Sequence, residues 1–167
     1  MEKRRVSSLS VNARKISGRV APYDKPTTIG NYVEIIRAGA FSESLQNNPD
    51  IIALVDHNTE RVLGRTKSGT LKLEERTDGL YFDLTLPDTQ DARDILALAE
   101  RGDIGGMSFG FTVPQGGDTW QGNRRELRNV NLIEVSIVTS FPAYPDTHVN
   151  MRSRNLMRLR LLELAKD

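Results

Sequence analysis

One stretch decides the fold class: TLKLEERTDGLYFDLTL, residues 70–86. Apolar and polar side chains alternate on both sides of Asp78 and Gly79. An Asp-Gly pair between two alternating runs is a strong signal for a tight turn that joins antiparallel strands. We therefore predict a β-hairpin here, with strands at residues 70–74 and 80–86.

Further short strands are predicted on both sides of this hairpin. They are residues 15–21, 32–36, 51–55, 109–113 and 131–138. Most alternate at least in part, whereas residues 51–55 form a continuous apolar run, which is typical of a buried strand. Seven or eight short strands separated by turn signals favour a mainly β fold with flanking helices, built as a mostly antiparallel closed barrel of about seven strands, over a parallel α/β fold.

The clearest helix signal lies at residues 89–101. Asp88 or Thr89 can cap the start of this helix, acidic residues occupy its first turn, and Gly102 follows its last turn, where glycine commonly ends a helix. Two further helices are predicted, at residues 40–47 and 155–165.

Length and charge predict one compact domain followed by a basic tail. The chain has 167 residues, of which 38% are hydrophobic, and this suits a single core. The net charge is +1, yet residues 151–167 carry five basic and two acidic side chains, so the tail is +3 and the remainder is −2. We expect one domain over residues 1–150 and a basic amphipathic helix or tail over residues 151–167.

Three interpretations of the tail stay open. Leu156, Leu159 and Leu162 lie on one side of the predicted helix, so the helix can pack on the domain or dock on helices of a partner. A nucleic-acid role is disfavoured, because residues 151–167 contain no aromatic side chain and the remaining chain is slightly acidic.

The composition disfavours several classes of site. The sequence has no cysteine and two histidines, His57 and His148, so we expect no disulfide, no metal site and no cofactor. No run of about 18 apolar residues predicts a membrane span, and the charged amino terminus lacks the apolar segment of a signal peptide. A cytoplasmic location is the expectation that follows.

Three residues form a candidate set for nucleophilic acyl transfer. Ser108 lies in the glycine-rich segment GGMSFGF, residues 105–111, and His57 follows the apolar run at residues 51–55. Glu134 lies inside a predicted apolar strand, where a carboxylate either faces solvent or is buried with a partner. A hydroxyl, a base and a group that orients the base are the minimum for such chemistry. Taken singly, Ser108 is better explained as a polar residue of a glycine-rich turn, and His57 as a capping histidine.

An ordered set of motifs resembles the prohead protease family of tailed bacteriophages, of the HK97 type. The resemblance runs from about residue 15 to residue 147. Its motifs are residues 32–41, 53–58, 63–66, 68–71, 79–80, 106–111, 134–138 and 142–144. The family is similar in fold to the herpesvirus assemblins, which have a mostly antiparallel barrel flanked by helices.

The resemblance implies a serine endopeptidase with Ser108 as nucleophile and His57 as general base. Assemblins use a second histidine as the third member, where this chain offers Glu134, and we take Glu134 as the orienting group. Asp56 and Asp83 are the rivals for that role. Asp56 adjoins His57 in the chain, so it would need an awkward turn to reach the far nitrogen of the imidazole.

The same resemblance implies partners and a location. Proteases of this family enter the assembling capsid, cut the scaffolding segment from the major capsid protein, and cleave themselves. A site inside the assembling prohead, in the host cytoplasm, is expected. The alternative is a non-catalytic capsid-assembly or scaffold-binding module on the same fold, in which Ser108 and His57 are incidental.

Overall fold

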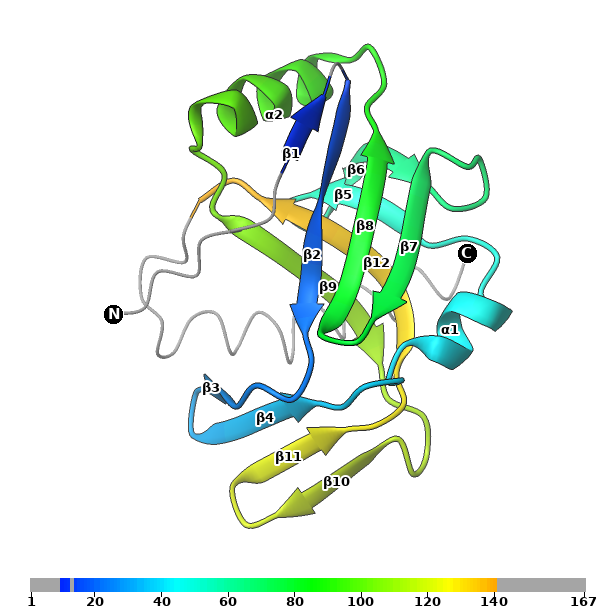
Figure 1. Ribbon diagram of the computed structural model, residues 1–167, viewed down its shortest axis with the longest axis vertical. Coiled ribbons are helices and arrows are strands. Elements are labelled where there is room, and N and C mark those ends of the chain that lie inside the picture. Colours follow the sequence, from blue (N-terminus) through cyan, green and yellow to red (C-terminus); the bar gives the residue numbers. More distant parts are fainter. Residues whose placement is uncertain (1–9, 13, 141–167) are drawn as a thin grey trace.

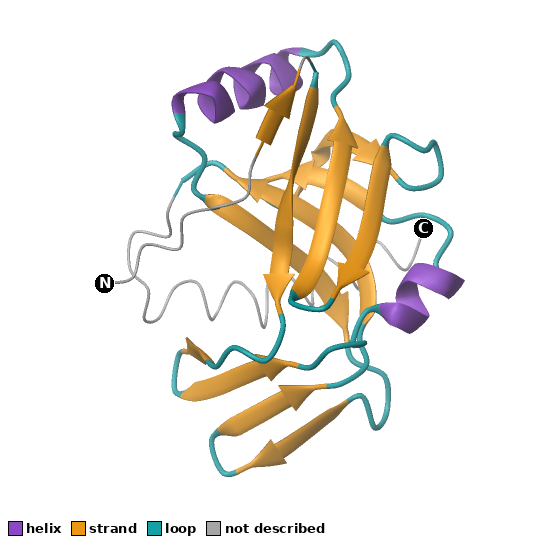
Figure 2. Ribbon diagram, in the orientation of Figure 1, coloured by secondary structure: helices purple, strands orange, loops and turns teal. Residues whose placement is uncertain are grey.

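The structure, a computed structural model, describes residues 10–12 and 14–140, and they form a mainly β fold (Figure 2). The strands pair into three four-stranded sheets. Sheet I contains β1 (Ser10–Asn12), β2 (Lys15–Pro22), β8 (Gly79–Thr85) and β7 (Leu71–Arg76), in that order. Sheet II contains β6 (Asn58–Arg65), β5 (Ile52–Val55), β12 (Asn131–Val138) and β9 (Gly106–Thr112). Sheet III contains β10 (Asp118–Gln121), β11 (Arg124–Leu127), β4 (Tyr32–Ile36) and β3 (Thr27–Ile29).

Sheet I lies across sheet II, and the core fills the space between them (Figure 1). Sheet I contributes buried side chains such as Phe82 and Leu84, and sheet II contributes Val55, Leu63 and Ile137. Burial of these apolar groups is the main favourable term in folding. Sheet III lies beyond one end of this pair of sheets (Figure 1).

The prediction of a mainly β, mostly antiparallel fold is confirmed, but the expected closed barrel is not found. Among the described residues, the strand ladders end at open edges and leave three separate sheets. Strands β2 and β9 are neighbours without a ladder between them. Two pairs, β5 with β12 and β4 with β11, are parallel. The sequence analysis missed five strands that are short, polar or irregular, namely β1, β3, β6, β10 and β11.

The predicted hairpin is confirmed, since β7 and β8 pair directly across the Asp78-Gly79 turn. Helix α2 (Gln90–Arg101) is also confirmed. Thr89 caps α2 by accepting a hydrogen bond from the Ala92 N–H, and Gly102 ends it in the left-handed region at φ 76°, as a C-terminal glycine does. The helix predicted at residues 155–165 and the tail at 151–167 lie outside the described residues. Within the described part of the chain, no helix has the length and apolar character needed to cross a membrane.

Helix α1 (Ser42–Asn47) agrees with the shorter predicted helix and is tied to sheets I and II by hydrogen bonds. The buried hydroxyl of Ser44 donates to the Val130 carbonyl at 2.7 Å and accepts from the Leu132 N–H at 2.8 Å, at the start of β12. The carboxylate of Glu75 on β7 accepts hydrogen bonds from Tyr23, Ser42 and the Phe41 N–H, at the start of α1. Burial, and then the hydrogen bond to Glu75, raise the pKa of Tyr23, so its hydroxyl stays a donor.

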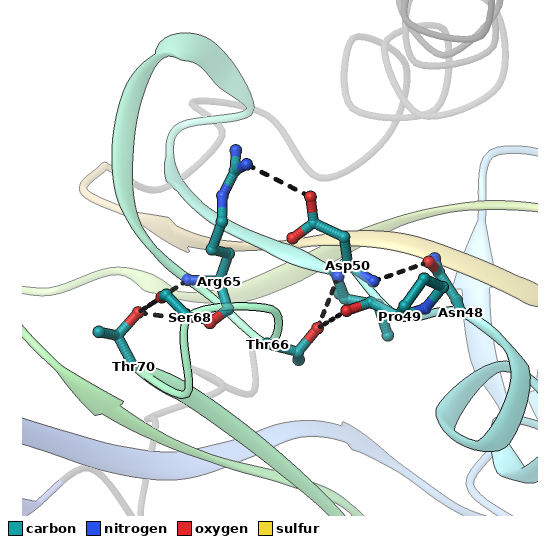
Figure 3. A network of polar contacts seen from close by, with 8 residues as sticks. Asn48, Pro49, Asp50, Arg65, Thr66, Ser68 and Thr70 are labelled. Carbon is teal, nitrogen blue, oxygen red and sulfur yellow. Dashed lines mark hydrogen bonds and ion pairs between the residues drawn. The ribbon is translucent and has the colours of Figure 1, made fainter.

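A polar network fixes the base of the β5–β6 hairpin (Figure 3). The Thr66 hydroxyl accepts from the Ile51 N–H at 2.8 Å and donates to the Pro49 carbonyl at 3.3 Å. The Thr66 N–H in turn donates to the Ile51 carbonyl at 2.9 Å. Arg65 forms an ion pair with Asp50 at 3.3 Å. These contacts anchor the start of β5 before it crosses the core.

Thr66→Val should lower the free energy of unfolding by about 1–3 kcal/mol, because the N–H of buried Ile51 loses its acceptor. Urea denaturation measures the change. Thr85→Val is the matched control: Thr85 is exposed on β8, so the same substitution there should change stability by less than about 0.5 kcal/mol. Equal effects of the two variants would contradict a structural role for the Thr66 hydroxyl.

Candidate active site

His57 lies in a two-residue turn between β5 and β6. Val55 and Asn58 pair across the turn, and both of its residues have left-handed backbones, with φ 50° at Asp56 and 56° at His57. A tight hairpin turn of this kind requires positive φ at both positions, and glycine is the usual second residue. A histidine in this conformation costs roughly 1–3 kcal/mol. The apolar run at residues 51–55 therefore ends as predicted, with the imidazole at the end of a buried strand.

Contacts with the end of β12 hold this turn. The Asp56 N–H donates to the Ile137 carbonyl at 3.0 Å. The Asp56 carboxylate accepts from the Thr139 N–H at 2.9 Å and from its hydroxyl at 2.7 Å. Arg61 lies 3.7 Å from the same carboxylate. Asp56, a rival for the orienting role, is thus engaged by Thr139 rather than by the imidazole.

Ser108 and Glu134 come from neighbouring antiparallel strands. In the ladder between β9 and β12, Ser108 pairs with Ser136 and Gly110 pairs with Glu134. Side chains two residues apart share a face of a sheet, so all four positions lie on one face. The opposite face of β12 supplies Val135 and Ile137 to the core.

A β-bulge near Ile133 decides which way Glu134 points. The register between β12 and β9 shifts between Leu132 and Glu134. In a regular strand these two side chains, two residues apart, would share a face; because of the bulge, Leu132 joins the core while Glu134 lies on the same face as Ser108. Simple alternation along the sequence could not show this.

The three candidate residues meet at hydrogen-bond distance. The His57 Nε2 lies 2.9 Å from the Ser108 Oγ, and the His57 Nδ1 contacts the Glu134 Oε1. The Glu134 side chain is 5% exposed and that of His57 is 23% exposed. Ser108 is half-buried. The arrangement therefore passes from a buried carboxylate, through a partly exposed imidazole, to the half-buried Ser108.

The glycine opposite Glu134 makes room for its carboxylate. A Cβ on Gly110 would lie 2.6 Å from the Glu134 Oε1 and 2.9 Å from its Cγ. No side chain fits there while Glu134 holds its position. This explains one of the glycines that surround Ser108 in the sequence.

The positions of Asp83 and Ser136 complete the account of the site. Asp83, the second rival acid, lies exposed on β8 of sheet I. Ser136 received no role in the sequence analysis, yet its hydroxyl contacts both the Glu134 carboxylate and the His57 backbone. Its position two residues after Glu134 was the only signal available. Among the described residues, no group of three or more His, Cys, Asp or Glu is placed to hold a metal ion.

The family of the chain follows from comparison with known proteins. The sequence model of the caudovirus prohead serine protease family matches residues 2–160 of this chain. The chain belongs to this family. A prohead protease of Enterobacteria phage HK97 is 33% identical over 113 residues, which make up 66% of this chain and 48% of that protein. The chain thus spans about half the length of this relative. No solved structure matches the chain significantly.

Gly110→Ala should lower the free energy of unfolding by about 1–3 kcal/mol, because the new methyl group overlaps the buried Glu134 carboxylate. Urea denaturation of a double-mutant cycle isolates the cause. In a Glu134→Ala background the methyl group has room, so the additional cost of Gly110→Ala should fall below about 0.5 kcal/mol. An equal cost in both backgrounds would mean that the strand needs glycine for another reason.

Proposed function

We propose that this chain is a serine endopeptidase of phage capsid maturation. The single observation that carries the proposal is the contact of the His57 imidazole with Ser108 on one nitrogen and with Glu134 on the other. Membership of the caudovirus prohead serine protease family gives the same reaction class. In this proposal Ser108 is the nucleophile, His57 the general base and Glu134 the orienting group.

The geometry suits this chemistry step by step. With a neutral imidazole, the Nδ1–H donates to Glu134 and the Nε2 accepts the proton of the Ser108 hydroxyl. The Ser108 oxygen attacks the peptide carbonyl, and the imidazolium then gives its proton to the leaving amine. Water completes the cycle by hydrolysing the acyl-enzyme. The buried Glu134 carboxylate fixes the tautomer and stabilises the imidazolium while it exists.

Membership of the family supports a proposal for the substrate and the location. We propose that the substrate is the major capsid protein, cut at its scaffolding segment, and that the chain also cleaves itself. The reaction takes place inside the assembling prohead in the host cytoplasm. No cofactor is required, because the Ser–His–Glu arrangement supplies nucleophile, base and orienting charge. In this proposal, residues 1–150 form the protease domain and the tail at 151–167 takes no part in the chemistry.

Ser108→Ala should abolish covalent labelling by a fluorophosphonate while leaving the melting temperature nearly unchanged. In the wild type, the Ser108 Oγ displaces fluoride from phosphorus and His57 takes the hydroxyl proton. Mass spectrometry locates the adduct. Ser68→Ala, at an exposed serine whose hydroxyl contacts Arg65 and Thr70, is the control and should label normally. A folded wild-type chain that never labels at Ser108 would favour the non-catalytic module instead.

Glu134→Gln should lower kcat for a cleavable capsid-derived peptide by up to about 10⁴-fold, the cost of an amide replacement in a Ser–His–Asp site. The amide cannot hold the imidazole in the same tautomer. Asp83→Asn makes the same chemical change at an exposed position of β8 and should leave kcat within about twofold. A loss of less than tenfold in Glu134→Gln would remove Glu134 from the orienting role.

A further inference from the structure

Ser136 is a fully buried serine that contacts two members of the candidate triad. Its hydroxyl accepts a hydrogen bond from the His57 backbone N–H at 3.0 Å and donates one to the Glu134 Oε2 at 2.7 Å. Its exposed fraction is 0%. One small side chain therefore joins the turn that carries the imidazole to the carboxylate that contacts it.

The turn needs such a restraint. Asp56 and His57 both hold left-handed backbones, which are disfavoured for residues with a Cβ and persist only where their surroundings fix them. Thr139 and the Ile137 carbonyl restrain Asp56. At His57, Ser136 supplies the hydrogen-bond acceptor for the backbone N–H. Ser136 thus binds the strained backbone at the residue that carries the imidazole.

The carboxylate needs the same restraint. One Glu134 oxygen contacts the His57 Nδ1, and the other accepts the Ser136 hydroxyl proton. Opposite Glu134, Gly110 leaves room for the carboxylate but offers it no hydrogen-bonding side chain. The contacts with His57 and Ser136, one on each oxygen, together set the plane of the carboxylate relative to the imidazole. A hydrogen bond to a charged, buried acceptor is among the stronger ones in proteins.

We propose that Ser136 is a positioning residue, which holds the His57 turn and the Glu134 carboxylate in the geometry for proton transfer from Ser108. This inference rests on the proposed function for its effect on rate. Ser136 itself touches neither substrate nor reacting atoms. The alternative is that Ser136 only stabilises β12, as any buried serine with two hydrogen bonds would.

Ser44 provides the matched control. It is also buried, at 6% exposure, and its hydroxyl also makes two hydrogen bonds, to Val130 and Leu132 at the start of β12. Those partners are backbone groups outside the candidate triad. Ser44→Ala and Ser136→Ala therefore remove the same atoms and the same number of hydrogen bonds around the same strand, and they differ in contact with the site.

The experiment compares both variants in the full chain. Each should lower the melting temperature. With a fluorophosphonate, the limiting rate of Ser108 labelling should fall about 10- to 100-fold in Ser136→Ala and stay within about threefold in Ser44→Ala, with the half-saturating concentration unchanged in both. Proton NMR supplies a second readout: the downfield signal of the His57 Nδ1–H bonded to Glu134 should persist in Ser44→Ala and shift upfield or broaden away in Ser136→Ala.

The following results would overturn the positioning role of Ser136 or, separately, the proposed function. Equal labelling rates in the two variants, together with an unchanged downfield signal, overturn the positioning role. If Ser136→Ala does not fold, Ser136→Cys retains a small side chain with a weaker donor, and its labelling rate and NMR signal should both differ from those of the wild type. A Ser136→Cys variant identical to the wild type in both readouts overturns the role as well. A wild type that does not label at Ser108 refutes the proposed function, whereas the NMR comparison still tests Ser136.

Discussion

The burial of the Glu134 carboxylate is the constraint on which the site depends. A buried charge without partners costs several kcal/mol, and Glu134 is buried in a strand made mostly of apolar residues. Two strands and one turn satisfy it: the hydroxyl of Ser136 on β12, the space left by Gly110 on β9, and the imidazole of His57. All these groups surround one carboxylate, so the geometry of the site depends on how sheet II is built.

The order of strands in sheet II brings these groups together. Strand β12 lies between β5, which it pairs with in parallel, and β9, which it pairs with in antiparallel fashion. The end of β5 and the middle of β9 therefore flank the same segment of β12, although they are far apart in the sequence. A parallel pair needs a long connection, and the chain between β5 and β12 uses its length to build β7 and β8 of sheet I, α2, and β10 and β11 of sheet III. The core between sheets I and II then holds β12 from its other face.

Strain at His57 and stability elsewhere are linked through β12. The left-handed turn is unfavourable by itself, and contacts with Ile137, Thr139 and Ser136 compensate for it. The same strand is hydrogen-bonded to Ser44 of α1 and contributes its own side chains Val135 and Ile137 to the core. Packing around β12 therefore holds the turn in place, and the proposed proton transfer from Ser108 to His57 depends on this positioning.

The sequence by itself determined the local elements and the residue types of the site. Asp78-Gly79 marked the β7–β8 hairpin, Thr89 and Gly102 marked the ends of α2, and the apolar run before His57 marked β5, because turn, cap and burial signals act over a few residues. The sequence also named Ser108, His57 and Glu134 as candidates. Only the tertiary structure decided that they meet, that sheets remain open where a barrel was expected, and that Ser136 joins two of them. Those outcomes depend on a bulge near Ile133, on parallel pairing and on strand order, all of which arise from contacts between segments distant in the chain.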